Sequence, residues 1–242
     1  MLVVLRAGDA VPEVAAHRGE FFGWIRAGVG PAWRGRWREV DLRDEGATLP
    51  RPGEAAGYII TGSACSVTER APWMLRAEQW LREAVAEHVP LLGICFGHQL
   101  LGQALGGRVA KNPRGREIGT TRLTLASAAT SDPLFEGLER DIAVNMTHVD
   151  TVAELPPGAT VLATTALEPH AAFRVGSAWG VQFHPEIDGD VMRGYLAARR
   201  ALVEAEGLPH ARLLAEATDA PDAASVLQRF ASHVQAATIR SA

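Results

Sequence analysis

Short apolar runs recur along the chain, with amphipathic segments between them. Four of these runs predict strands, at residues 2–5, 39–42, 57–61 and 90–95. Between the last two, apolar side chains over 73–88 recur at near-helical spacing, which predicts a crossover helix. A second helix is expected over 97–105, because Gly106 and Gly107 then suit a left-handed C-terminal cap. Strands that alternate with helices are typical of an α/β fold with a largely parallel sheet.

The middle of the chain is richer in strand patterns, and the end returns to helix. We expect strands at residues 120–125, 141–146 and 160–164, and a hairpin over 171–183 that turns near Gly176 and Ser177. Helical patterns follow over 191–206 and 223–236. This last part is too short for a second catalytic domain. We therefore predict one domain over 1–190 and a C-terminal helical extension over 191–242, packed on that domain.

Composition and charge narrow the classes of function. With 242 residues and 47% hydrophobic content, the chain can bury one large core. Its net charge of -4 gives no positive field for a nucleic acid or an anionic membrane. Two cysteines are too few for a disulfide framework, and no apolar run approaches the roughly 20 residues that span a bilayer. We expect a soluble, cytoplasmic protein that acts on a small molecule.

Cys95 lies in Gly-Ile-Cys-Phe-Gly-His-Gln, where a predicted strand passes into a predicted helix. A side chain on such a tight turn needs glycine two residues before and after it, here Gly93 and Gly97, because the backbone comes close there. Unpaired amides at the start of the helix favour the thiolate, which is the reactive form. The alternative is that Cys95 is a small buried apolar side chain. The glycines favour a nucleophile, whereas Cys65 has no such setting.

His184 follows an apolar run and precedes Pro185 and Glu186. Proline keeps His184 extended, and residues two apart in extended chain project to the same side. The Glu186 carboxylate can therefore reach one imidazole nitrogen and leave the other free for a thiol. Alone, this tripeptide is more typical of a surface turn. Together with Cys95 it supplies the base and the orienting group of a catalytic triad.

Neither a metal nor a cofactor is expected. The other histidines lack the spacing of a zinc site, and Lys111, the only lysine, lies outside any Schiff-base or phosphate-loop motif. We interpret the basic residues over 108–116 as a solvated hairpin, with a partner surface as the alternative. Tryptophan and arginine residues are interspersed over 24–38, a pattern that suits the stacking of nucleic-acid bases. The negative net charge favours a packed flap over the sheet instead.

Taken together, the segments at 93–99 and 181–186 (Val-Gln-Phe-His-Pro-Glu) resemble the motifs of class I glutamine amidotransferases, especially the glutaminase domain of GMP synthase and its stand-alone relatives. The resemblance runs from about residue 41 to 187 and includes Asn112-Pro113 and Thr147-His148-Val149-Asp150. It implies a flavodoxin-like three-layer sandwich around a mostly parallel central sheet, with the C-terminal helices added.

The resemblance also implies a role for each matching residue. Cys95 would attack the carboxamide carbon, His184 would take and return the proton, and Glu186 would hold His184. A thioester on Cys95 would then be hydrolysed by water. Further substrate contacts are implied for Gly62, Gln99, Thr147 and His148.

An oxyanion hole is implied as well. The family's loop, commonly Ser-Gly-Gly-Pro, matches Thr-Gly-Ser-Ala at 61–64. The backbone amides of Ser63 and Phe96 would then stabilise the tetrahedral oxyanion, each by roughly 3 kcal/mol. Serine replaces the second glycine and the proline is missing, which changes the geometry of the loop but keeps the backbone donor.

Three functions stay open at this point. A glutaminase would pass ammonia to a separate synthase partner, whereas a free-standing γ-glutamyl hydrolase or peptidase needs no such partner. A catalytically silent binding protein would usually have lost a triad residue, and here all three are present. For either enzyme the substrate is a small molecule, glutamine or a γ-glutamyl compound, with no nucleic acid or membrane involved.

Overall fold

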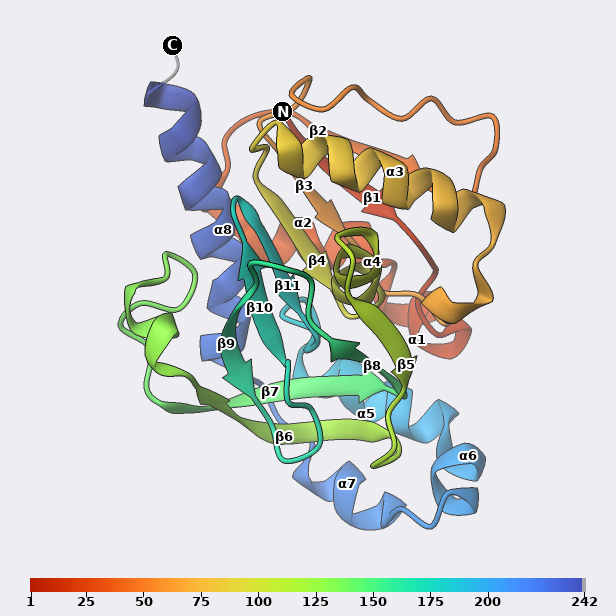
Figure 1. Ribbon diagram of the computed structural model, residues 1–242. Helices are drawn as coiled ribbons and strands as arrows, with labels where there is room; N and C mark the ends of the chain where they lie inside the picture. Colours follow the sequence, from red (N-terminus) through yellow and green to blue (C-terminus); the bar gives the residue numbers. More distant parts are fainter. Residues whose placement is uncertain (241–242) are drawn as a thin grey trace.

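The computed structural model describes residues 1–240 and is built around a mixed sheet (Figure 1). The strand order in this sheet is β2-β1-β3-β4-β11-β10-β9-β6-β7. The first five strands in this order run parallel, and the remaining ones extend the sheet with antiparallel pairs. Their bounds are β1 Leu2–Arg6, β2 Trp37–Asp41, β3 Gly57–Ile60, β4 Leu91–Ile94, β6 Glu117–Leu125, β7 Asp141–His148, β9 Thr160–Thr164, β10 Ala172–Val175 and β11 Ala178–Val181.

Helices cover both faces of the sheet, which confirms the predicted three-layer α/β fold. Successive side chains of a strand point to opposite faces. Accordingly Leu2 and Val4 pack in one hydrophobic cluster, with α2, α5 and α8, while Val3 and Leu5 pack in the other, with α3 and α4. The helices are α1 Pro12–Arg18, α2 Phe21–Val29, α3 Pro72–Ala86, α4 Phe96–Ala104, α5 Gly189–Ala198, α6 Arg200–Ala205, α7 His210–Glu216 and α8 Pro221–Arg240.

Most predicted elements are confirmed, and three predictions were wrong or incomplete. The helix expected over 191–206 is broken into α5 and α6 at Arg199, and α1, α2 and α7 were not predicted. The basic segment is no hairpin: β5 (Arg108–Lys111) pairs antiparallel with the distant β8 (Asp150–Glu154) in a separate two-stranded sheet. The expected flap is confirmed only for α2 and the segment after it, where Trp24 and Trp33 are buried, because Trp37 begins β2, a strand of the sheet itself.

Candidate active site

Cys95 occupies the sharp turn between β4 and α4. Its backbone has φ 50° and ψ −101°, an unusual conformation for a residue with a side chain. A Cβ on Gly93 would lie 2.4 Å from the carbonyl oxygen of Gly97, and one on Gly97 would lie 2.6 Å from that of Ile60. Any larger residue at either position would therefore force the turn open. The predicted strand-to-helix elbow is present, and glycine is needed on both sides of it.

His184 and Glu186 follow β11, the strand beside β4 in the sheet. The Nδ1 of His184 donates a hydrogen bond to Oε1 of Glu186 over 2.7 Å, and both side chains are buried. Because Nδ1 carries this proton, Nε2 is the nitrogen that can accept one. Nε2 is buried and has no hydrogen-bond partner within residues 1–240. The pair therefore has the arrangement of a base held by a carboxylate.

The imidazole and the thiol-bearing carbon meet beside Gly62. From the point that a Cβ of Gly62 would occupy, His184 Cε1 is 3.0 Å away and Cys95 Cβ is 3.8 Å away. The ring of Phe21 stacks on His184 with a centroid separation of 6.5 Å and an interplanar angle of 16°. The fold thus brings Cys95, His184 and Glu186 together from the ends of two neighbouring strands.

The charges of Cys95 and His184 shift each other's pKa. Burial alone would raise the pKa of the Cys95 thiol, but the charge of His184 outweighs it and holds the pKa below its ordinary value. Burial likewise opposes a charge on His184, yet the carboxylate of Glu186 and the sulfur of Cys95 together raise its pKa to about 10. Both shifts favour the ion pair of a thiolate and an imidazolium, and the thiolate is the form of cysteine that attacks a carbonyl carbon.

Two other histidines near Cys95 are unsuited to act as the base. Both ring nitrogens of His98 are buried without a hydrogen-bond partner in the described chain, and burial lowers its pKa to about 3. His148 donates Nδ1 to the carbonyl oxygen of Asp150 over 2.9 Å and Nε2 to Glu117 over 3.1 Å. Burial opposes a charge there, but Glu117 raises the pKa of His148 above its ordinary value. Acceptor oxygens therefore face both ring nitrogens of His148, and neither nitrogen is free to act as a base.

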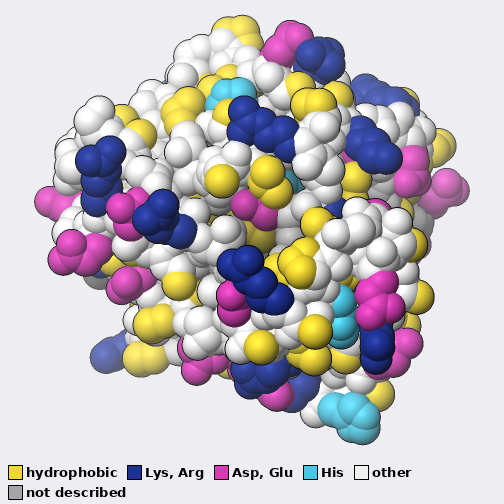
Figure 2. All heavy atoms as spheres, turned by 90° about the horizontal axis from the view of Figure 1, so that it is seen from below, with side chains coloured by type: hydrophobic (Ala, Val, Ile, Leu, Met, Phe, Trp, Pro, Cys, Tyr) yellow, Lys and Arg dark blue, Asp and Glu magenta, His cyan; other side chains and the backbone are white. Residues whose placement is uncertain are grey.

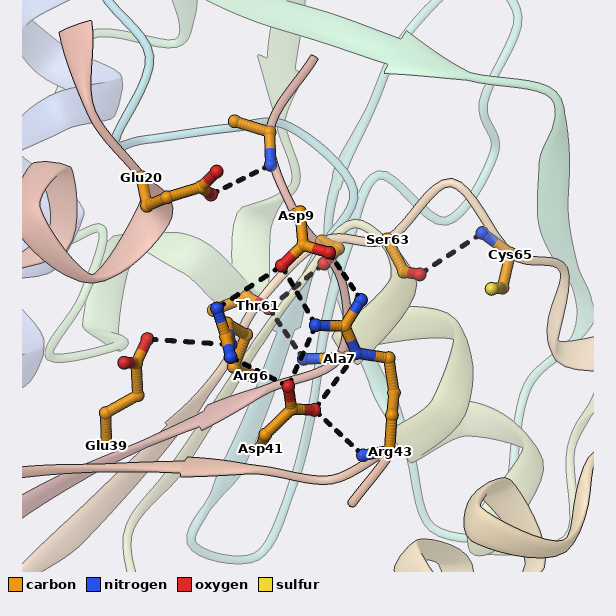
Figure 3. Close-up of polar contacts among 12 residues, drawn as sticks. Arg6, Ala7, Asp9, Glu20, Glu39, Asp41, Arg43, Thr61, Ser63 and Cys65 are labelled. Carbon is orange, nitrogen blue, oxygen red and sulfur yellow. Dashed lines mark hydrogen bonds and ion pairs between the residues drawn. The ribbon is translucent and has the colours of Figure 1, made fainter. Parts of the chain in front are cut away.

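The loop that carries Ser63 meets the loop that follows β1 (Figure 3). The loop after β3 is held to the loop after β1 by the amide of Ala7, which donates to Thr61 Oγ1 over 2.9 Å. A Cβ on Gly8 would lie 2.6 Å from Ser63 Cα, so glycine permits this close approach. Phe96 is the first residue of α4, where amides have no intrahelical partner. The backbone amides of Ser63 and Phe96 are therefore the candidate donors.

An ion-pair network anchors the same corner (Figure 3). Arg43 donates to Asp9 over 2.6 Å and to Asp41 over 2.8 Å, and Arg6 also donates to Asp41 over 2.8 Å. Arg43 holds the pKa of Asp41 at about 2, against the desolvation that would raise it. The network fixes the loop that follows β1, which lines the site.

Two cavities meet at Cys95 on the face of the molecule where the parallel strands end, a face that is hollowed near its centre (Figure 2). The one we call the Gln99 cavity has a volume of about 300 Å³ and also reaches Asp150 and Arg116. Gln99 donates to the carbonyl oxygen of Asp150 over 2.8 Å and to Gln182 over 3.0 Å. The other, the His184 cavity, measures about 260 Å³ and is lined by Phe21.

The predicted substrate contacts fall in different places. Gln99, Thr147 and His148 line the Gln99 cavity. The carbonyl oxygen of Thr147 is 3.9 Å from Cys95 Sγ. Gly62 lines neither cavity and packs against the imidazole of His184 instead.

Several residues of the site were not predicted from the sequence. Arg116 and Arg199 line the Gln99 cavity, and Arg199 and Tyr195 line the His184 cavity. Gly8 is needed for the oxyanion loop. The only local signal was the Gly-Asp pair at 8–9, shortly after the first strand. Arg116 precedes β6, Tyr195 lies in α5 and Arg199 follows α5, and only the fold brings them to the site.

Within residues 1–240, no group of three or more His, Cys, Asp or Glu side chains is arranged to hold a metal ion. None of the helices in that range is long and apolar enough to cross a bilayer.

Comparison with known proteins gives one family. Residues 41–201 match the model of the family described as glutamine amidotransferase class-I. GMP synthase [glutamine-hydrolyzing] of Porphyromonas gingivalis is 41% identical over 133 residues, which are 54% of this chain and 25% of that protein. GMP synthase of Pyrobaculum aerophilum is 37% identical over 153 residues, 63% of this chain and 28% of the relative. The chain thus spans only about a quarter of the length of these curated relatives.

Solved structures share the fold over nearly the whole chain. A glutamine amidotransferase of Thermotoga maritima has a TM-score of 0.73 at 24% identity, covering 96% of both chains. A glutamine amido transferase of Methylobacillus flagellatus has a TM-score of 0.74 at 22% identity, covering 99% of this chain and 94% of the other. At these identities the likeness concerns the fold alone.

Proposed function

Because the chain belongs to the class I glutamine amidotransferase family, we propose that it hydrolyses the side-chain amide of glutamine through a thioester on Cys95. The GMP synthases that it resembles are named as glutamine-hydrolysing. The observation that carries the proposal is the buried pair of His184 and Glu186, joined over 2.7 Å, beside a cysteine on a strand-to-helix turn. A binding protein would have no need of a thiol whose pKa is lowered by a neighbouring imidazolium.

In the first half of the reaction, the thiolate of Cys95 attacks the carboxamide carbon and the carbonyl electrons move onto oxygen. The amides of Ser63 and Phe96 stabilise this oxyanion. When it collapses, the carbon–nitrogen bond breaks, and Nε2 of the His184 imidazolium gives its proton to the departing nitrogen. Ammonia leaves and the γ-glutamyl group remains on sulfur as a thioester.

In the second half, His184 is neutral and acts as the base. Nε2 takes a proton from water, whose oxygen attacks the thioester carbon and forms a second oxyanion in the same hole. Collapse breaks the carbon–sulfur bond, releases glutamate and restores the thiolate with its imidazolium. Glu186 holds the ring throughout and favours its charged form.

The Gln99 cavity is the proposed place for the amino-acid end of glutamine. Of the side chains that line only this cavity, it presents a carboxylate, Asp150, and a guanidinium group, Arg116. These charges complement the ammonium and carboxylate of an α-amino acid. Gln99, Thr147 and His148 form the rest of this proposed subsite.

The test is glutaminase activity in the purified chain and in Cys95→Ser. We expect ammonia and glutamate in equal amounts from the wild type and none above background from the variant. A glutamine-like electrophile should label Cys95 alone, with Cys65→Ser as the matched control that still reacts. Equal background activity in all three proteins, with no labelling, would reject the proposal. A synthase that takes up the ammonia is the partner this function implies, and retention of such an enzyme on the immobilised chain would identify it.

A further inference from the structure

The two cavities at Cys95 divide the site into two sides. Both are lined by Ser63, Ala64, Cys95, Thr147 and Arg199. Only the Gln99 cavity reaches Gln99 and Asp150, and only the His184 cavity reaches His184. A carbonyl carbon bonded to sulfur therefore has space on each side for one of its two substituents.

Proton transfer decides which substituent takes which side. The departing nitrogen must receive its proton from Nε2 of His184, so it lies within hydrogen-bond reach of that atom. The amine part of the substrate therefore faces the His184 cavity, and the γ-glutamyl part extends into the Gln99 cavity.

The His184 cavity is much larger than glutamine requires. Ammonia is close in size to water, which takes up about 30 Å³. The cavity measures about 260 Å³. Part of its wall is formed by apolar or aromatic side chains, Val11, Pro12, Phe21 and Tyr195. Such a wall suits an organic substituent on the nitrogen better than it suits ammonia.

Arg199 adds a cation that has no acidic partner. Its guanidinium donates to Thr147 Oγ1 and lies over the ring of Tyr195, 5.2 Å from the centroid. Within residues 1–240, no carboxylate lies within ion-pair distance of it, whereas Arg116 pairs with Glu206 over 2.8 Å. Asp9, the acidic residue of the His184 cavity, is already paired with Arg43.

Leaving such a charge partly buried costs free energy, which the hydrogen bond to Thr147 and the ring of Tyr195 offset only in part. Burial lowers the pKa of Arg199 from its ordinary value, in keeping with this unfavourable setting. A guanidinium pairs best with a carboxylate, through two parallel hydrogen bonds. A substrate that brings a carboxylate into the His184 cavity would remove the cost.

We propose that the His184 cavity binds the amine half of a γ-glutamyl amino acid, with Arg199 as the specificity-determining residue that pairs with its carboxylate. The inference rests on the proposed function and extends its substrate class. The bond changes are those of glutamine hydrolysis, with one replacement: the carbon–nitrogen bond that breaks joins the γ-glutamyl group to an amino acid, whose nitrogen takes the proton from His184. Water completes the reaction, so no acceptor enzyme is required.

Three substrates separate the effect of an organic group on the nitrogen from the effect of its carboxylate: glutamine, γ-glutamyl-L-alanine and γ-glutamyl-L-alaninamide. The last two differ in the charge of one carboxylate. We expect kcat/KM for γ-glutamyl-L-alanine to exceed that for the alaninamide by about 10- to 100-fold, as for a hydrogen-bonded charge pair. In Arg199→Gln this ratio should fall to about one, through a rise in KM for γ-glutamyl-L-alanine. Arg199→Lys should recover part of it, because it keeps the charge but loses the planar fork.

Arg200→Gln is the matched control, because Arg200 is the next residue, is exposed, and pairs with Glu204. It should keep the wild-type ratio. Val11→Trp, which fills the His184 cavity, should lower hydrolysis of γ-glutamyl-L-alanine at least tenfold more than that of glutamine. Thermal unfolding of each variant shows whether it has folded.

The outcomes distinguish this inference from the proposed function. Wild-type activity on glutamine with no preference for the carboxylate would overturn the inference alone. So would an Arg199→Gln variant that loses all three activities equally, since Arg199 would then serve the γ-glutamyl side. Failure of the wild type to hydrolyse any of the three substrates faster than Cys95→Ser would reject both.

Discussion

Gly62 tests the geometry of the site more directly than removal of a catalytic group. The substitution Gly62→Ala adds one methyl group at a point 3.0 Å from His184 Cε1. Carbon atoms in contact ordinarily lie about 3.5–4.0 Å apart. The imidazole must therefore move by about 0.5–1 Å, although Glu186 holds its Nδ1 over 2.7 Å. The backbone of Gly62 itself requires no strain, because its φ is not positive.

The size of the effect follows from that displacement. A shift of about 1 Å in a catalytic group costs about 100-fold in rate. We expect kcat/KM for glutamine to fall by about 10- to 100-fold, which is about 1.4–2.7 kcal/mol in the activation free energy. The free energy of unfolding should fall by about 1–3 kcal/mol from overpacking, so the protein stays folded. Ammonia release and thermal unfolding measure the two quantities.

Gly23→Ala is the matched control. Gly23 lies in α2, is exposed, and a Cβ there would meet no atom within 4 Å. This variant should keep the wild-type rate and gain about 0.5–1 kcal/mol of stability, since alanine suits a helix better than glycine. Full activity in Gly62→Ala, or an equal loss in both variants, would refute the geometry of the site.

Three further predictions concern charge. The value of kcat/KM should rise with increasing pH as Cys95 loses its proton, and the pKa of this rise should lie below the ordinary thiol range. It should fall above about pH 10, as His184 loses its proton. A pH–rate profile measures both changes. Glu186→Gln removes the carboxylate that raises the pKa of His184, so kcat/KM should drop by at least about 100-fold and the alkaline limb should move to lower pH; an unchanged limb would contradict this role. Asp41→Asn should cost about 1 kcal/mol, because the pair with Arg43 is partly exposed to solvent. As the pKa of Asp41 is lowered from 3.8 to about 2, this cost is fully present above about pH 4 and disappears as the pH falls to about 2, which urea unfolding at several pH values would show.

The sequence predicted the parts of the site whose causes are local. The elbow depends on glycines two residues from Cys95, and the orientation of His184 depends on Glu186 two residues away. Each of these arrangements therefore depends on residues within a short stretch of the chain. The buried parallel strands were equally predictable, because they are short apolar runs bounded by polar segments. The α/β fold followed from their alternation with helices.

The parts that the sequence did not predict depend on contacts between distant residues. Gly8 is needed because Ser63 lies against it, and the two are 55 positions apart in the sequence. The strand β5 finds its partner in β8, about 40 residues on, and four residues carry too little alternation to reveal it. Arg199 has no motif around it. It lies where α5 ends and α6 begins, and only the packing of these helices brings it to Cys95.

The position of Arg199 also bears on the predicted division at residue 190. The helices beyond it contribute two side chains, Tyr195 and Arg199, to the wall of the His184 cavity. They share a hydrophobic cluster with the strands as well: Phe230 of α8 is fully buried in the same cluster as Leu2 of β1. A helical segment that completes both the core and the site cannot be removed without exposing apolar surface and opening the cavity. We therefore propose that residues 191–240 fold together with 1–190 as one cooperative unit, and that the C-terminal helices set which amine the enzyme releases.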